Sequence, residues 1–430
     1  HGDWLSQRDD SFERFIPILS SVFKDCAIGV STNRDFWVYG SSIKSIESNV
    51  NRTFDSYARS LTFFKNTGDL QYATSIVNSD ISWSAGLKRK LEKKEEIASF
   101  SKTKFTKSMY RPYFVQNLYY ERNGIIERPG RWNSIIINSM PSECNYVICV
   151  TGVGAKSFCC LMVDKIPCLD FVEKTQCFPR YLYEQQASAK ATESASLFEA
   201  PSSENEVAGY KRKDAITSEA LKHFQDAYPG ESVTTDAIFY YIYGILHSEE
   251  YRTRYANNLM KELPRIPRVA TYEAFKKFEE AGRKLAELHV NFEQVEEYKA
   301  VKVNIDKREG WSYYVTQMKY GKIPGKTGNA AKDKTKLVYN DFITIEGIPL
   351  EAQKYVVNKR SALDWIVERA CVKVDKDSGI VNDFNDFAAE KGDPRYPLSL
   401  FLKVLTVSLE TMKIVKGLPK LEIHPLDSQA

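Results

Sequence analysis

The stretch Tyr146-Val-Ile-Cys-Val-Thr-Gly-Val-Gly-Ala-Lys-Ser-Phe-Cys-Cys-Leu-Met-Val163 decides the fold. It contains two short apolar runs, at 146–150 and 158–163, separated by the turn residues Thr151-Gly-Val-Gly154. Short apolar runs with a glycine-containing turn between them are typical of paired strands. The cysteines within them behave as small apolar side chains. We therefore expect a buried hairpin or sheet pair here, with the β-type sequence ending near Cys177-Phe-Pro179.

The sequence before this stretch alternates between strand and helix patterns. Two short β-type runs between Cys26 and Tyr39 flank a polar turn, and the pattern is helical from Ile43 to about Phe64. We expect a strand pair that leads into a helix. A short, very basic helix is predicted at 84–97, followed by Tyr-rich strands and turns in which prolines recur.

The sequence after it is mostly helical until residue 297. Residues 185–209 are rich in Ala, Ser and Glu and are predicted to be a linker or surface excursion. Residues 298–348 return to a β-type pattern, in which glycines and Pro324 predict a loop that projects from a hairpin. Ser361-Ala-Leu-Asp364 predicts the start of a helix, and a final helix is expected from about Leu398. The helices predicted between these regions span 217–228, 235–247, 249–262 and 271–291.

The predicted fold class is α+β: a β-rich region interrupted by a helical block, with a C-terminal helix. The 430 residues exceed one usual core, so several domains are expected. We place them at 1–65, a connector; 66–210, a basic, Tyr-rich, β-containing region that ends in the linker; 211–297, the helical block; and 298–430, a β-hairpin region with a basic loop and C-terminal helices.

Composition predicts a soluble cytoplasmic protein. No apolar run reaches the roughly 18 residues that cross a bilayer, and no signal peptide opens the sequence. The first residue is His1, which suggests that the sequence begins inside a longer polypeptide. The eight cysteines include no C-x-x-C pair, so we expect reduced thiols and no zinc site.

Positive charge is concentrated in two parts of the chain. Basic segment 1, residues 81–136, carries twelve Lys and Arg against five Asp and Glu. Basic segment 2, residues 316–338, carries six Lys against one Asp, although the whole chain has a net charge of only +4. Cations gathered on an otherwise acidic chain, with Tyr, Trp and Arg interleaved, suit a surface that meets a polyanion. We expect the partner to be double-stranded DNA.

The two basic segments favour different contacts with DNA. Arginine forks match guanine edges and phosphates, and segment 1 offers the rigid turn Arg128-Pro-Gly-Arg131-Trp132. Segment 2 has lysines and no arginine, so phosphate contact is expected. The alternatives are a solvated helix for segment 1 and a plain surface loop for segment 2. The residues expected to face the major groove are Lys88, Arg89, Lys104, Lys107, Arg111, Arg128 and Arg131. The other predicted DNA-binding residues are Lys90 and, for phosphate contact, Lys322, Lys326, Lys332, Lys334 and Lys336.

Catalytic motifs fail when they are tested against their spacing. Thr151–Ser157 and Gly321–Thr327 do not meet the phosphate-loop pattern. Asp80 with Glu92-Lys93-Lys94 imitates a nuclease site, but a run of like charges is more often a solvated face. No His lies beside a Ser or Cys nucleophile, and no element that grips an extruded base is present. We therefore predict no catalytic residue, no metal site and no cofactor in this chain.

The sequence resembles the C-terminal part of the single-polypeptide restriction-modification enzymes called type ISP. Matching phrases occur in order along nearly the whole chain. They are His1-Gly-Asp-Trp-Leu5, Thr32-Asn-Arg-Asp-Phe-Trp-Val-Tyr39, Ser108-Met-Tyr-Arg-Pro-Tyr113, Asp164-Lys-Ile-Pro167, Phe239-Tyr-Tyr-Ile-Tyr-Gly-Ile-Leu-His247, Leu263-Pro-Arg-Ile-Pro267, Ala281-Gly-Arg-Lys-Leu-Ala-Glu-Leu-His289, Ser361-Ala-Leu-Asp-Trp365 and Val404-Leu-Thr-Val-Ser-Leu-Glu-Thr411.

This resemblance implies a target recognition domain that reads a short duplex sequence, preceded at 1–65 by the tail of a methyltransferase module. It also implies that nuclease, ATP-driven translocase and adenine methyltransferase modules lie upstream in the same polypeptide. The full-length enzyme would use S-adenosylmethionine, ATP and Mg, none of them bound by this chain. The alternative is a structural docking platform, in which the helical block and the terminal helix hold the methyltransferase and translocase modules together.

Overall fold

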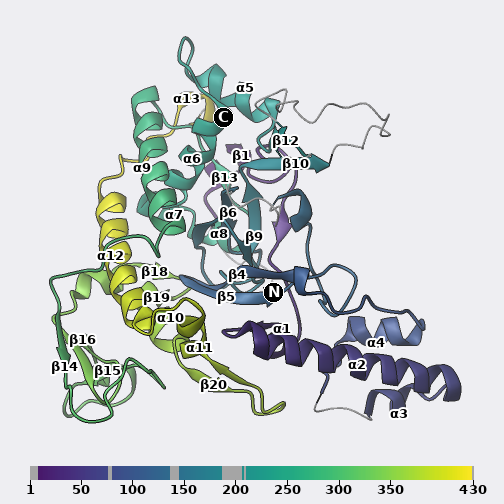
Figure 1. The fold of residues 1–430 in the computed structure, drawn as a ribbon. Coiled ribbons are helices and arrows are strands. Elements are labelled where there is room, and N and C mark those ends of the chain that lie inside the picture. Colours follow the sequence, from purple (N-terminus) through teal and green to yellow (C-terminus); the bar gives the residue numbers. More distant parts are fainter. Residues whose placement is uncertain (1–7, 76–79, 136–144, 186–205, 208–209, 429–430) are drawn as a thin grey trace, which may run out of the picture.

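The computed structural model describes residues 8–75, 80–135, 145–185, 206–207 and 210–428 (Figure 1). Helices and small sheets alternate along the chain, so the predicted α+β class is confirmed. The phrase His1-Gly-Asp-Trp-Leu5, Cys144 and most of the predicted linker at 185–209 lie outside the described residues. Among the residues that are described, no helix is long and apolar enough to cross a membrane.

The predicted hairpin at 146–163 is confirmed. Strand β6 (Val147–Val150) pairs antiparallel with β7 (Cys160–Val163), and every residue of both strands is buried. Strands β9 (Gln176–Pro179) and β2 (Ala27–Ile28) complete a four-stranded sheet in the order β2-β9-β6-β7. This sheet lies near the middle of the molecule (Figure 1).

Both faces of this central sheet are covered by apolar side chains. Val147 and Cys149 of β6 belong to one hydrophobic core, whereas Ile148 and Val150 belong to another. Successive residues of a strand point to opposite faces, so each face of the sheet has its own core. A strand that is buried on both faces has no position for a polar side chain. This explains the unbroken apolar runs in the sequence.

The upper core, which contains Ile148 and Val150, is built mainly from the helical block. Thr217, Thr234 and Thr271 cap three of its helices, because each hydroxyl oxygen accepts a hydrogen bond from the backbone N–H three residues later. The predicted helices are confirmed, except that the one expected at 249–262 is divided at Tyr255. The helices are α5 (Ser218–Ala227), α6 (Thr235–Ile245), α7 (Glu249–Arg254), α8 (Ala256–Lys261) and α9 (Tyr272–Val290).

Helices α6 and α9 approach each other closely at two glycines. A Cβ atom on Gly282 would lie 1.9 Å from the Tyr240 carbonyl oxygen, and one on Gly244 would lie 2.2 Å from the Phe278 carbonyl oxygen. Such distances are far below van der Waals contact, so only glycine allows this crossing.

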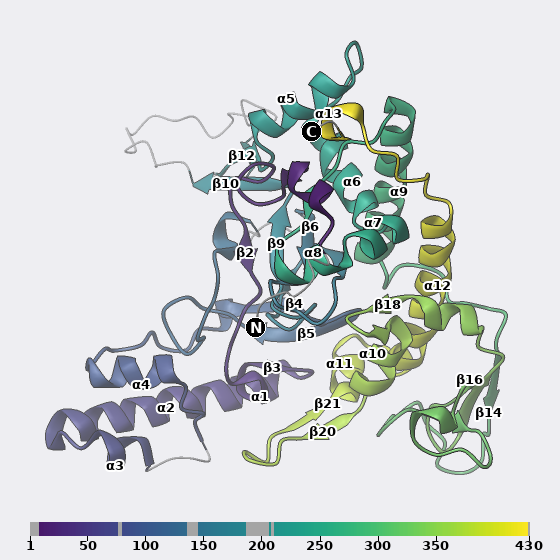
Figure 2. The same cartoon turned by 180° about the vertical axis from the view of Figure 1, so that it is seen from behind.

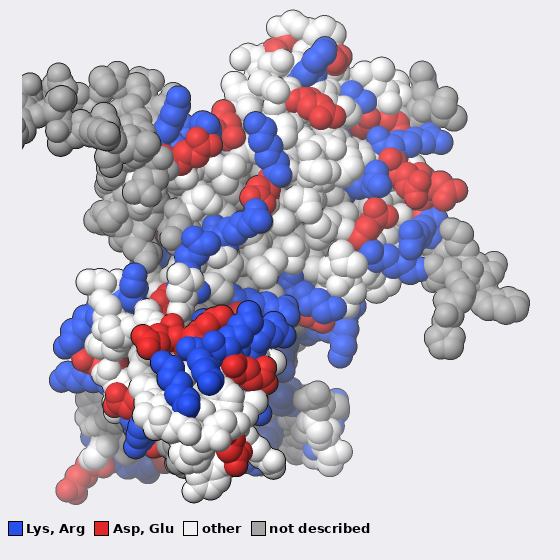
Figure 3. Space-filling view, turned by 90° about the vertical axis from the view of Figure 1, so that its right-hand side faces the viewer, with Lys and Arg blue, Asp and Glu red and all other residues white. Residues whose placement is uncertain are grey.

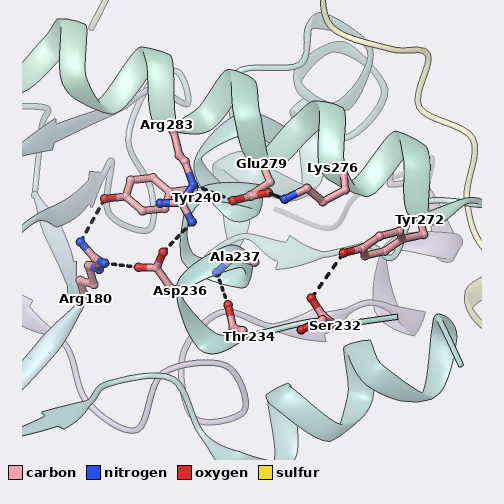
Figure 4. A network of polar contacts seen from close by, with 10 residues as sticks. All are labelled: Arg180, Ser232, Thr234, Asp236, Ala237, Tyr240, Tyr272, Lys276, Glu279 and Arg283. Carbon is pink, nitrogen blue, oxygen red and sulfur yellow. Dashed lines mark hydrogen bonds and ion pairs between the residues drawn. The ribbon is translucent and has the colours of Figure 1, made fainter. Parts of the chain in front are cut away.

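Ion pairs also connect α6 and α9 near this crossing (Figure 4). Arg283 of α9 reaches Asp236 at the start of α6 at 2.5 Å and donates to Glu279 at 2.6 Å. Its guanidinium also lies 4.2 Å from the centroid of the Tyr240 ring. Arg180 contacts Asp236 from the other side. These cations are therefore engaged within the protein.

A second sheet lies below the central one and differs in part from the prediction. Its order is β3-β5-β4-β8, with β3 (Tyr39–Gly40), β5 (Phe114–Tyr119), β4 (Phe105–Arg111) and β8 (Ile166–Pro167). The strand pair expected between Cys26 and Tyr39 is wrong. β2 and β3 belong to different sheets, and Asp35–Val38 forms the short helix α1. The backbone N–H of Trp37 donates to the carbonyl of Arg34 there.

Three helices form an arm that projects from the lower sheet (Figures 1 and 2). They are α2 (Ile43–Thr67), as predicted, with α3 (Leu70–Ser75) and α4 (Ala85–Glu92), which is shorter than expected. Tyr57, Leu61, Leu87 and Leu91 give the arm a small core of its own.

The C-terminal region places a separate sheet and three helices beside the lower sheet. The sheet has the order β14-β17-β16-β15, with β14 (Lys302–Ile305), β17 (Ile343–Glu346), β16 (Lys332–Val338) and β15 (Lys319–Lys322). β15 and β16 form the predicted hairpin. Ser361 caps its helix as expected, with Oγ accepting from Asp364 N at 3.1 Å. The helices are α10 (Ala362–Arg369), α11 (Phe384–Glu390) and α12 (Tyr396–Lys416).

Shorter elements complete the fold. The lower core draws Val30, Val147, Phe292 and Phe401 from all four predicted segments, so these segments share a core and their boundaries stay predictions. The remaining strand pairs and helix include β1 (Ile16–Pro17) with β13 (Arg265–Ile266), β10 (Tyr181–Gln185) with β12 (Tyr210–Asp214), β18 (Val356–Val357) with β19 (Arg360–Ser361), β20 (Val372–Val374) with β21 (Val381–Asp383), and α13 (Pro425–Ser428).

A buried chain of hydrogen bonds joins the central sheet to α6, α9 and α12. Met162 N donates to Tyr243 Oη at 2.8 Å, so the tyrosine hydroxyl is free to donate to His289 Nδ1 at 2.6 Å. His289 Nε2 then donates to Thr411 Oγ1 at 2.9 Å. Burial lowers the pKa of His289 to about 3, and it lowers the pKa of the neighbouring His247 well below its usual value.

We expect Gly282→Ala to destabilise the protein by about 1 to 3 kcal/mol or more, because its methyl group would collide with the backbone of α6. Gly417→Ala at the end of α12 is the matched control, since its new Cβ would meet its nearest atom at 3.4 Å. Urea denaturation measures both free energies of unfolding. Equal stability of the two variants would contradict the close crossing.

The two buried histidines predict a loss of stability in mild acid. Their folded pKa values lie below the unfolded value near 6.5, so the unfolded state binds more protons as the pH falls from 6.5 toward 3. Each histidine then costs about 1.4 kcal/mol per pH unit within this window. Thermal melts between pH 8 and pH 4.5 should show a shallower decline for His289→Gln than for the wild type. His424 is the control: burial lowers its pKa too, but less at this partly exposed position, so the decline for His424→Gln should lie closer to that of the wild type.

Candidate nucleic-acid interface

The basic helix α4 presents its cations outward because its apolar side is buried in the arm. Leu87 and Leu91 are buried, whereas Lys88 and Arg89 are exposed. Neither cation has a side-chain hydrogen bond or ion pair among the described residues. Lys90 instead donates to the carbonyl of Gly124 at 2.8 Å. Of the three predicted cations on this helix, two are thus available to a ligand.

The start of α4 is anchored to the loop that contains Glu127. Ser84 Oγ accepts from Leu87 N at 3.3 Å, and the Glu127 carboxylate accepts from Gly86 N at 2.9 Å. A carboxylate at this end of a helix also complements the helix dipole. The buried Arg34 side chain donates to Ser84 Oγ and to backbone carbonyls, and burial lowers its pKa to about 10. These contacts therefore fix α4, the turn with Arg34 and the loop with Glu127 relative to one another.

Three predicted DNA-binding residues lie on strand β4 or just before it, and their surroundings differ. Lys104 lies exposed just before the strand and has no side-chain partner among the described residues. Lys107 donates to Asn117 Oδ1 at 2.5 Å and lies 4.3 Å from the centroid of the Phe387 ring.

The Arg111 side chain is only partly exposed, and internal contacts hold its guanidinium, so its predicted role at the major groove stays a prediction. Its guanidinium donates to the Tyr110 carbonyl at 2.6 Å and to Cys168 Sγ at 3.2 Å, and it stacks on the Tyr110 ring. Tyr110 belongs to β4 itself, and Cys168 follows directly after β8. Arg111 therefore serves the internal packing of the lower sheet.

The turn Arg128-Pro-Gly-Arg131-Trp132 is fastened to the body by backbone hydrogen bonds, and its aromatic ring faces inward. Arg128 pairs with Ser31 through two backbone hydrogen bonds of 2.8 and 3.0 Å, and Trp132 Nε1 donates to the Ile28 carbonyl at 3.1 Å. Both arginine side chains are exposed. Arg131 pairs with Asp25 at 3.1 Å, and such exposed pairs are worth little and exchange easily.

Basic segment 2 divides into free and paired lysines on the β15–β16 hairpin. Lys334 contacts Asp364 at 2.8 Å and Lys336 contacts Glu346 at 2.7 Å. Lys322, Lys326 and Lys332 are exposed and have no side-chain partner among the residues that the structure describes. The free lysines lie at the loop end of the hairpin, and the paired ones lie within the sheet.

The two basic segments lie at opposite ends of the lower edge of the molecule. The arm with α4 forms one end and the sheet with β15 and β16 forms the other, and the β20–β21 hairpin projects between them (Figures 1 and 2). Figure 3 shows the arm's end, where Lys and Arg side chains gather in the lower half with a few acidic side chains among them. The segments thus form two separate positive regions instead of one patch.

Sequence reasoning missed an exposed aromatic loop between these regions. Trp311 is 36% exposed and Tyr314 is 50% exposed, and Lys307 lies 5.8 Å from the centroid of the Trp311 ring. The signal was present in Lys307-Arg-Glu-Gly-Trp311, which combines cations, a glycine and a flat side chain.

The described residues contain no group of three or more His, Cys, Asp and Glu side chains placed to hold a metal ion. Asp80, the acidic residue of the rejected nuclease pattern, lies 3.7 Å from Arg52 and 3.8 Å from Arg59. Its carboxylate is therefore occupied by ion pairs on the arm.

The chain belongs to the type ISP C-terminal specificity domain family, whose model matches residues 21–400. Three solved structures resemble it over 98% of its length. A nuclease-deletion mutant of the type ISP restriction-modification enzyme LlaGI, in complex with a DNA substrate mimic, is 31% identical with a TM-score of 0.78. The ATP-dependent type ISP enzyme LlaBIII bound to DNA is 30% identical with a TM-score of 0.80.

The third structure, a DrdV–DNA complex, is 28% identical with a TM-score of 0.77. The chain spans 36% of the LlaGI chain, 25% of the LlaBIII chain and 40% of the DrdV chain. No curated protein sequence matches it. The predicted membership in the type ISP enzymes is confirmed.

Arg111→Ala is expected to destabilise the protein by about 1 to 3 kcal/mol, because the Tyr110 carbonyl and Cys168 lose their donor and the Tyr110 ring loses its cover. Lys104→Ala, at the exposed start of the same strand, should leave the melting temperature unchanged. Equal melting temperatures for the two variants would show that Arg111 is not an internal residue.

Proposed function

We propose that this chain is the target recognition domain of a single-polypeptide restriction-modification enzyme. It would bind double-stranded DNA at a specific sequence and so direct adenine methylation and restriction by upstream modules. Membership in the specificity-domain family carries this proposal. The DNA in the LlaGI, LlaBIII and DrdV structures supports it. The exposed cations of α4 and of the β15–β16 hairpin that have no side-chain partner among the described residues support it as well.

The free cations suit two kinds of contact. The lysines at the tip of the β15–β16 hairpin are mobile point charges, which fit phosphate oxygens along a backbone. Arg89, Arg128 and Arg131 are exposed and offer planar forks, which fit either phosphates or guanine edges. Because the two regions are separate, we expect the duplex to lie along the lower edge between them.

The proposed role needs no chemistry from this chain. Methyl transfer, ATP hydrolysis and cleavage would belong to upstream modules that use S-adenosylmethionine, ATP and Mg. Those modules and double-stranded DNA are the proposed partners, and the cytoplasm of a prokaryote is the proposed location.

A structural docking platform is the second candidate. A groove of about 1170 Å³ lies between α9 and α12 and is lined by charges of both signs, such as Lys277, Glu280 and Lys413. A neighbouring module could cover this groove without any contact between the chain and DNA. Saturable binding of the chain to one duplex sequence in preference to others would favour recognition over docking.

The free lysines of basic segment 2 should dominate its contribution to DNA affinity. We expect Lys322→Ala, Lys326→Ala and Lys332→Ala together to weaken binding to all duplex sequences alike. They should flatten the plot of log affinity against log salt by roughly 0.9 for each phosphate that a lysine no longer neutralises. Fluorescence anisotropy over a salt series measures both quantities.

The paired lysines of the same hairpin provide the matched control. Lys334→Ala combined with Lys336→Ala should change the salt slope less per lysine, because each ammonium group already contacts a carboxylate. An unchanged slope in the triple variant would remove this hairpin from the interface.

A further inference from the structure

A cavity lies in the middle of the lower edge, where the arm meets the body. Its volume is about 580 Å³, and its walls come from parts of the chain that are far apart in sequence. The Ser31–Trp37 turn forms one wall, residues 81–83 and Lys88 form another, and the loop between β20 and β21 forms the third. These walls belong to elements that Figure 1 shows around the junction of the arm with the body, on the side of the β20–β21 hairpin.

Polar groups without internal partners converge on this cavity. Lys88, Asp170 and Asp377 line it, are exposed, and form no side-chain hydrogen bond or ion pair among the described residues. Asn33 also lines it; its side-chain oxygen accepts from Ser31 Oγ at 3.3 Å, and within the described chain its amide nitrogen donates to no acceptor. A structural role does not account for these four side chains.

Two buried donors beside the cavity lack acceptors as well. Arg34 is 3% exposed and its Nε has no hydrogen-bond partner within the described chain, and the same holds for the buried Nε1 of Trp83. Both residues line the cavity. Buried N–H groups are nearly always paired, so these two donors mark a wall at which the described chain leaves polar groups without internal partners.

The wall that carries Asn33 is held rigidly. Asn33 adopts a left-handed backbone with φ of 52°, which asparagine tolerates better than most residues. Thr32 Oγ1 accepts from Arg34 N at 3.1 Å, and Arg34 ties this turn to residues 82, 84 and 125. A fixed position for Asn33 suits recognition by hydrogen-bond geometry.

The β20–β21 hairpin adds an apolar surface next to the polar wall. Val374 and Val381 face each other across the hairpin and are 55% and 51% exposed. Asp375 is used within the hairpin turn, where it accepts from Ser378 N at 3.0 Å, so Asp377 is the carboxylate that this hairpin leaves for a ligand.

We propose that this cavity reads the edge of one base pair in the recognised DNA. This inference rests on the proposed function and deepens it, since it names the residues that discriminate between sequences. The donors of Asn33 and Lys88 suit the acceptor atoms of a purine edge. The carboxylate of Asp377 suits an exocyclic amino group of cytosine or adenine, and the exposed valines suit a thymine methyl group. The basic regions on either side hold the phosphates and bring this edge to the cavity.

The test begins with the wild-type 430-residue chain and a pool of randomised duplexes. Sequencing the retained duplexes gives the preferred sequence, and anisotropy at fixed salt gives the affinity for that duplex and for each single base-pair change. In Asp377→Asn and Lys88→Gln we expect binding to the preferred duplex to weaken roughly 5- to 150-fold, with discrimination abolished at one base-pair position. The salt slope should stay unchanged.

Asp55→Asn is the matched control for charge. Asp55 is an exposed carboxylate on α2 that does not line the cavity and has no partner among the described side chains. Its removal should leave discrimination at every position as in the wild type. Thermal melts of all three variants should match the wild type, because the altered side chains are exposed.

The outcomes separate this inference from the proposed function. If the wild type selects a sequence but Asp377→Asn and Lys88→Gln discriminate as it does at every position, the cavity does not read bases and the recognition role stands. If Lys88→Gln weakens all sequences alike and lowers the salt slope, Lys88 contacts a phosphate and its place in the reading is overturned. If the wild type selects no sequence, the proposed function itself fails.

Discussion

Burial of the β6–β7 hairpin on both faces is the constraint on which the rest of the structure depends. One face supports the helical block through Ile148 and Val150, and the other supports the lower sheet through Val147 and Cys149. The buried hydrogen-bond chain from Met162 through Tyr243 and His289 extends this support to α12. The arm and the C-terminal sheet are attached to the lower core, so the spacing of the two basic regions follows from this central layer.

Local pairing, more than the number of cations, decides which of them are available to the proposed DNA partner. Lys332, Lys334 and Lys336 alternate along one strand, yet only Lys332 is without a carboxylate partner among the described residues. Arg111 contributes to the charge of basic segment 1, but its contacts are internal. A positive segment is thus a mixture of structural cations and free ones, and only the free cations can displace the counterions that surround a DNA backbone.

Local patterns predicted most elements, and long-range contacts account for the failures. The hairpin, α2, the helical block and the Ser361 cap follow from apolar spacing and capping chemistry that the sequence displays directly. Phe36–Tyr39 has a β-type composition, but α1 forms there because the buried Arg34 fixes the preceding turn. The internal contacts of Arg111 and the placement of Asn33 and Asp377 at one cavity depend on tertiary packing, which charge and spacing along the chain do not encode.

The cavity between the arm and the body takes its walls from the beginning, the middle and the end of the chain. A single recombination crossover between the genes of two relatives would therefore join half of one cavity to half of another. Inherited changes of specificity at this place would have to arise by point substitutions at scattered positions, because no contiguous block of sequence contains the whole site. The rigid Asn33 turn and the β20–β21 loop can each accept such substitutions without disturbing the buried central sheet.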